Sequence, residues 1–82
     1  MEPWMKQLED RISARVNGHE LVHYKTVILP RIVADFYKQL SAAGVNIPVN
    51  EEYCMEDGSM VIVLKGIKDN AGKCRIVSVD IK

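Results

Sequence analysis

The feature that most constrains the fold is an almost continuous apolar run at residues 60–67, enclosed by two turn signals. Asp57-Gly58 before the run fits a two-residue hairpin turn, and residues 69–72 after it fit a second turn. A short apolar run between turns is typical of a strand that is buried on both faces. With a short strand at 53–56 and an alternating strand at 73–81, the C-terminal third predicts a three-stranded antiparallel meander.

A first helix is predicted at residues 3–16. Proline suits the first helical position, because its missing N–H costs nothing there, and Asn17-Gly18 suits a helix end. The same Asn-Gly pair also fits a hairpin turn between strands at 12–16 and 19–23, which we keep as an alternative. The helix is favoured by an apolar residue at every fourth position: Trp4, Leu8, Ile12 and Val16.

Residues 20–28 are rich in β-branched and aromatic side chains, which favour a strand. Pro30 supports this interpretation, because a helix running through a proline loses a hydrogen bond and about 3 kcal/mol. We therefore predict a strand at 20–28 and a second helix over 30–43, ended by Gly44. That helix is amphipathic, with an apolar face made of Ile32, Val33, Phe36, Tyr37, Leu40 and Ala43.

These elements predict one small α+β domain over residues 1–82: an N-terminal helix, and a second amphipathic helix packed on a sheet built around the meander. The net charge of zero disfavours a general nucleic-acid binder, which normally carries a basic excess. Apolar residues make up 48% of the chain, more than a small monomer readily buries, so a homodimer is expected. Without a signal peptide or a membrane-spanning segment, we expect a cytoplasmic location.

The two cysteines are expected to stay unpaired. The predicted turns place Cys54 opposite Val61 and Cys74 opposite Ile67, at opposite ends of the middle strand. A disulfide needs Cα atoms about 4.4–6.8 Å apart, which this register excludes.

One motif points to chemistry: His19-Glu20-Leu21-Val22-His23 matches H-E-x-x-H. Its flanking uncharged residues partly resemble the zincin metalloproteases. That resemblance implies His19 and His23 as zinc ligands and Glu20 as the general base that activates a metal-bound water. Lys25 departs from the family pattern, and no third ligand can be assigned.

The motif works only on a helix, where residues four apart lie about 6 Å from one another. On a strand they lie about 13 Å apart, too far for one ion. The strand predicted at 20–28 and the zinc site therefore exclude each other. We favour the strand, expect no cofactor, and keep a zinc-dependent hydrolase as the alternative.

Two other groups of residues are candidates for binding. A basic cluster around the second hairpin could contact nucleic acid; it comprises Lys65, Lys68, Lys73 and Arg75. Aromatic and apolar anchors suited to another protein are Trp4, Met5, Leu8 and Tyr53.

We expect a non-enzymatic module that binds another protein through a sheet edge or through the helix that carries Trp4. Proteins of this profile are often regulators, adaptors or inhibitors, including those encoded by phages and mobile elements. The alternatives are the zinc-dependent hydrolase and a weak nucleic-acid binder that uses the hairpin at 65–75.

Overall fold

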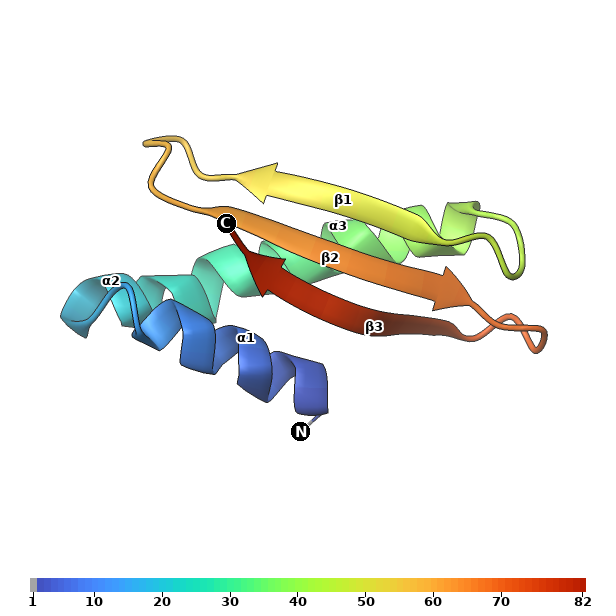
Figure 1. The fold of residues 1–82 in the computed structure, drawn as a ribbon, viewed down its shortest axis with the longest axis horizontal. Helices are drawn as coiled ribbons and strands as arrows, with labels where there is room; N and C mark the ends of the chain where they lie inside the picture. Colours follow the sequence, from blue (N-terminus) through green and yellow to red (C-terminus); the bar gives the residue numbers. More distant parts are fainter. Residues whose placement is uncertain (1) are drawn as a thin grey trace.

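The computed structural model describes residues 2–82 and confirms the α+β class. Three strands form one antiparallel sheet in the order β1-β2-β3. Figure 1 shows α3 lying along one face of this sheet and α1 running beside β3. The elements are α1 Pro3–Ser13, α2 Gly18–His23, the π-helix η1 Tyr24–Ile28, α3 Leu29–Ala42, β1 Val49–Cys54, β2 Val61–Lys68 and β3 Cys74–Ile81.

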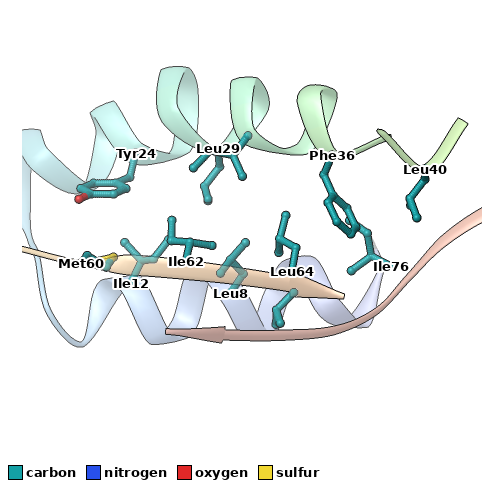
Figure 2. Close-up of a cluster of buried hydrophobic side chains, with 12 residues drawn as sticks. Leu8, Ile12, Tyr24, Leu29, Phe36, Leu40, Met60, Ile62, Leu64 and Ile76 are labelled. Atoms are coloured by element: carbon teal, nitrogen blue, oxygen red, sulfur yellow. The ribbon is translucent and has the colours of Figure 1, made fainter. Parts of the chain in front are cut away.

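The core lies between the two long helices and one face of the sheet. Figure 2 shows side chains of the η1–α3 helix projecting toward the middle strand, with Leu8 and Ile12 of α1 closing the cluster. Burying this apolar surface is the main source of the domain's stability. The side chains that are fully buried are Leu8, Ile12, Leu29, Phe36, Leu40, Met60, Ile62 and Leu64.

The predicted strand at 20–28 is wrong, because this segment is helical. The chain passes from α2 into η1, where the Leu29 amide donates to the Tyr24 carbonyl, five residues earlier. This wider π turn ends just before Pro30, which then lies in the first turn of α3, where a proline is tolerated. The wider turn also puts Tyr24 and Leu29, both buried, on the same face of the helix.

The first helix ends at Ser13 rather than at residue 16. Gly18 has a φ of 59°, a left-handed value that glycine adopts without strain. Asn17 before it is extended, so the chain reverses here and a new helix starts at Gly18. The alternative hairpin of strands at 12–16 and 19–23 is therefore also wrong.

The strand register follows the sequence prediction with two shifts. Cys54 pairs with Val61 as predicted, although β1 starts earlier, at Val49. Cys74 pairs with Lys68 rather than with Ile67. The Asp69 amide donates a hydrogen bond to the Lys73 carbonyl, so the second turn begins after Asp69 and not at Asp69. Both cysteines are free thiols.

A β-bulge breaks the predicted alternation of β3. The register between β2 and β3 shifts at Lys65/Gly66, so Ile76 and Val79 are both buried while Val77 is 59% exposed. Gly66 sits at this shift because a Cβ there would lie 2.7 Å from the carbonyl oxygen of Arg75. The close approach of two strands and a helix therefore requires glycine at this position.

Candidate functional site

A groove of about 1120 Å³ opens between the N-terminal half of the long helix and the end of the β1–β2 hairpin. Its walls come from two segments that are twenty or more residues apart in the sequence, so only the fold brings them together. Side chains at 15, 16, 19, 20, 23, 24, 27, 28, 31 and 32 form the helix wall, and those at 52–57 and 59 form the hairpin wall. Apolar side chains with a few polar groups around them are the usual lining of a binding site.

The helix wall follows a strict four-residue repeat: His19, His23, Val27 and Arg31 line the groove. In a regular α-helix, two side chains twelve residues apart point in directions that differ by about 120°. His19 and Arg31 would therefore lie on different sides of such a helix. A π turn takes up one extra residue, which reduces this offset to about 20°. The π-helix η1 therefore keeps His19 and Arg31 on the same wall.

β1 is an edge strand, with β2 as its one neighbour in the sheet. The Met55 amide bonds to the Met60 carbonyl, and Lys82 exchanges both backbone bonds with Val61. Val61 therefore directs its backbone groups away from β1, so Cys54 and Val61 are a non-hydrogen-bonded pair. Because hydrogen-bonded and non-hydrogen-bonded pairs alternate along an antiparallel ladder, the backbone groups of Glu52, like those of Cys54, point away from β2. These groups form a free edge beside the groove, which is a template for another strand.

Tyr53 fixes the position of this edge relative to the helix. Its hydroxyl donates a 2.7 Å hydrogen bond to the carboxylate of Asp35 on α3. This bond, with help from Gln39, holds the pKa of Asp35 below its ordinary value. Burial, followed by the hydrogen bond to Asp35, raises the pKa of Tyr53 well above its ordinary value, so the hydroxyl keeps the proton that it donates.

Two of the three carboxylates on the hairpin wall have partners within the chain. Glu52 pairs with the ammonium of Lys82 at 2.5 Å. Asp57 accepts a hydrogen bond from the Ser59 amide, and interactions with Ser59 hold the pKa of Asp57 below its ordinary value. Glu56, which is exposed, makes no ion pair with any residue in 2–82.

The H-E-x-x-H residues lie in this groove. His19, Glu20 and His23 are helical and exposed, and all three line the helix wall. The helical geometry that the zincin motif requires is therefore present. A catalytic zinc site also needs a third protein ligand, and residues 2–82 contain no cluster of three histidine, cysteine or acidic side chains placed to hold an ion.

The predicted protein-binding residues fall in two places. Leu8 is fully buried in the core, so its side chain is not at the surface, and Trp4 packs partly against the same core. Met5, beside them on α1, is half-buried. Tyr53, by contrast, lines the groove.

The four basic residues of the second hairpin do not lie on one surface. Lys65 and Arg75 are exposed on the sheet face that points away from the core, and Lys73 is exposed in the turn. Lys68 instead donates a 2.7 Å hydrogen bond to the Ser41 carbonyl, near the end of α3. It caps that helix, so the four cations do not form one continuous surface.

Sequence reasoning missed the groove because the strand predicted at 20–28 concealed the helix wall. The usable signal was the four-residue repeat of His19, His23, Val27 and Arg31, which extends the H-E-x-x-H spacing through Pro30. The hairpin wall gave no local signal, since it meets the helix only in the folded chain.

Comparisons with known proteins add no relative: no family model, curated protein or solved structure matches this chain. Over residues 2–82, the helices are too short or too polar for any of them to cross a membrane.

Proposed function

We propose that this domain is a small protein-binding module that captures an extended segment of another protein by strand addition to β1. The observation that carries this proposal is the free edge of β1, whose outward backbone groups at Glu52 and Cys54 border the groove. Strand addition supplies affinity through main-chain hydrogen bonds, and the adjacent groove supplies specificity through side-chain contacts.

The composition of the groove supports this mode of binding. Val27, Ile28 and Met55 are half-buried apolar side chains in its walls, and charged side chains lie among them. An apolar surface with a polar rim is the common form of a peptide site. A strand added at β1 would direct alternate side chains toward the helix wall.

Such a module acts as a regulator, an adaptor or an inhibitor, of the kind that phages and mobile elements encode. Its action is non-enzymatic and cytoplasmic in this proposal. A homodimer formed through the same edge of β1 would compete with the partner, so oligomeric state and binding are linked.

The test compares two substitutions of one residue. Glu52→Pro and Glu52→Ala both remove the carboxylate that pairs with Lys82, but the proline alone removes the outward N–H. The probe is a peptide recovered by selecting a random display library on the full chain. We expect Glu52→Pro to weaken binding by about tenfold or more, and Glu52→Ala by less than about threefold.

Equal effects of the two variants, with both folded by circular dichroism, would contradict strand addition. The proline is compatible with the fold because it stands on an edge strand with its nitrogen facing solvent.

The helical conformation of residues 19–23 favours a second candidate, a zinc-dependent hydrolase in which Glu20 is the general base and His19 and His23 are ligands. Glu56 is an exposed carboxylate on the opposite wall of the same groove. Elemental analysis of purified protein should then give about one zinc per chain, and none in His19→Gln. Protein with only trace zinc and no hydrolysis of peptide substrates would exclude this candidate.

A further inference from the structure

We infer that the segment captured by β1 is basic, with a lysine or arginine opposite Glu51 and a second one beside Glu56 and Asp57 at the end of the strand. This inference rests on the proposed strand addition and specifies the chemistry of the partner. It follows from the charge of the edge strand and from the way side chains pair across neighbouring strands.

The edge strand and the turn that follows it are acidic throughout. Residues 49–59 contain four carboxylates and no lysine or arginine: Glu51, Glu52, Glu56 and Asp57. Within residues 2–82, one of these four makes an ion pair, which joins Glu52 to Lys82. A segment that lies along β1 therefore meets three carboxylates that have no cationic partner in the described part of the chain.

The arginines of the helix wall do not cancel this charge. Arg15 donates a 3.0 Å hydrogen bond to the Lys82 carbonyl, so its guanidinium is directed toward the residue that follows β3. Arg31 is offset on its own wall by Glu20, which makes no ion pair over residues 2–82. With histidine neutral at pH 7, the groove is lined by four carboxylates against two guanidiniums, which leaves it a negative excess.

Glu51 lies where an added strand brings a side chain close to its carboxylate. Glu51 and Tyr53 are two residues apart, so both side chains are on the face of β1 that is turned toward α3. The backbone groups of Glu51 point toward β2, so it forms a non-hydrogen-bonded pair with the added strand, with Cα atoms about 4.5 Å apart. Opposite charges stabilise such a pair and like charges destabilise it. Since Glu51 is half-buried, salt screens this pair less than one at the open surface.

The second basic position lies four residues along the segment, about 13 Å from the first. On the same face, the segment passes Tyr53 and then Met55, which both line the groove. Beyond Met55 the chain turns through Glu56 and Asp57, which are exposed at this end of the groove. The side chain opposite Met55 is therefore the one nearest to these two carboxylates.

Between the two basic positions, the side chain opposite Tyr53 is apolar, because an aromatic side chain favours an apolar neighbour across the strands. The bound segment thus has a basic residue, an apolar residue two positions later and a basic residue two positions after that. This pattern is the same in both directions, so it applies to a parallel and to an antiparallel segment.

The same charge opposes a second copy of the chain at this edge. Pairing β1 with β1 of another copy would bring together two strands that each carry three carboxylates without a cationic partner within residues 2–82. Like charges between two partners disfavour their association. The edge is therefore selective for a basic segment over its own strand.

The test selects a display library of random ten-residue peptides on the full chain and measures the recovered peptides by calorimetric titration. We expect lysine or arginine at two positions four residues apart, an apolar residue midway between them, and few acidic residues. Binding should weaken as salt is added, because the turn carboxylates are exposed.

Charge exchange identifies the pairing. Glu51→Lys and Glu56→Lys should each weaken binding of such a peptide by about tenfold. Two further peptides each have one of the two basic residues replaced by glutamate. One of them should bind Glu51→Lys about tenfold more tightly than it binds the wild type, and the other should do the same for Glu56→Lys. Glu56 is exposed in a turn, so Glu56→Lys keeps the test decisive if Glu51→Lys does not fold.

Asp10→Lys is the matched control, because it makes the same change of charge at an exposed position of α1 outside this groove. It should change affinity by less than about twofold.

The outcomes separate this inference from the proposed function. Peptides that are sensitive to Glu52→Pro but lack the basic pattern, or glutamate peptides that rescue neither lysine variant, would overturn the inference and leave strand addition standing. A wild-type dimer that Glu52→Pro converts to a monomer in analytical ultracentrifugation would also overturn it, since a second copy would then occupy the edge. Peptides that bind equally to Glu52→Pro and Glu52→Ala, or a library that yields no binder, would overturn the proposed function itself.

Discussion

The hydroxyl of Tyr53 on β1 donates a 2.7 Å hydrogen bond to the carboxylate of Asp35 on α3. This bond joins the edge strand to the helix beside the groove, so the width of the groove depends on it. The two residues lie 18 positions apart in the sequence, and no local pattern connects them.

The first prediction concerns the pH dependence of this bond. Because the pKa of Asp35 in the fold is below its ordinary value of 3.8, the bond contributes stability above that pH and loses it as the pH falls through the lowered pKa. Tyr53→Phe should therefore be less stable than the wild type at pH 6, and the difference should shrink toward pH 2. Chemical denaturation at several pH values measures the free energy of unfolding of the wild type and of Tyr53→Phe.

Asp35→Asn is the control for this prediction, because it keeps a hydrogen-bond acceptor and removes the titrating group. The difference in stability between Asp35→Asn and the wild type should also become smaller in acid. Wild-type and Tyr53→Phe curves that stay parallel from pH 6 to pH 2 would show that Asp35 does not carry this effect.

Much of the fold could be predicted from local sequence patterns. The apolar run at 60–67 and its two flanking turns gave the meander, because both the period of a strand and the chemistry of a turn are local properties. Cys54 pairs with Val61 as the first turn predicted. The apolar face of the helix after Pro30 was likewise recovered, with Ile32, Phe36 and Leu40 buried.

The error at residues 20–28 arose from two local rules that tertiary packing overrode. β-branched residues favoured a strand, and Pro30 argued against a continuous helix. A π turn satisfied both the proline and the core, since it buries Tyr24 and Leu29 on one face. Five-residue spacing of buried positions matches neither the helical nor the strand template, so periodicity could not reveal it.

A second prediction tests this explanation of the π turn. Pro30→Ala supplies an N–H and removes the ring, which makes a regular α-helix available. The burial of Tyr24 and Leu29 opposes that change, so we expect η1 to persist and the free energy of unfolding to change by less than about 1 kcal/mol. Backbone chemical shifts of residues 24–28 and exchange protection of the Leu29 amide are the measurements. A regular helix at 24–28 would mean that the proline alone imposes the turn.

A third prediction concerns Gly66. A Cβ at this position would lie 2.7 Å from the Arg75 carbonyl oxygen and 2.9 Å from atoms of Leu40 and Phe36. Because the backbone oxygen cannot move aside, Gly66→Ala should destabilise the domain by about 1–3 kcal/mol. Gly44→Ala is the matched control. Its Cβ would meet the end of the exposed Ile47 side chain, which can move, so a loss below about 1 kcal/mol is expected. Similar losses at both glycines would contradict the close packing at Gly66.

A fourth prediction separates core from surface on α1. Leu8 is fully buried, so Leu8→Ala should lower the free energy of unfolding by about 2–5 kcal/mol, enough to unfold much of a small domain. Met5→Ala, at a half-buried position on the same helix, should lower it by about 1 kcal/mol or less. Thermal unfolding by circular dichroism measures both. A Leu8→Ala variant as stable as the wild type would show that Leu8 and α1 do not contribute to the core.

The most direct test of the groove as a peptide site is an NMR titration of the isotope-labelled chain with a selected peptide. We predict that the amide signals of Glu52 and Cys54 shift most on β1, together with those of His19, His23 and Arg31 on the helix wall. The same titration should leave Trp4 and Val77 unchanged, because they lie outside the groove. Shifts confined to α1 around Trp4, or to the outer sheet face around Val77, would contradict the central claim.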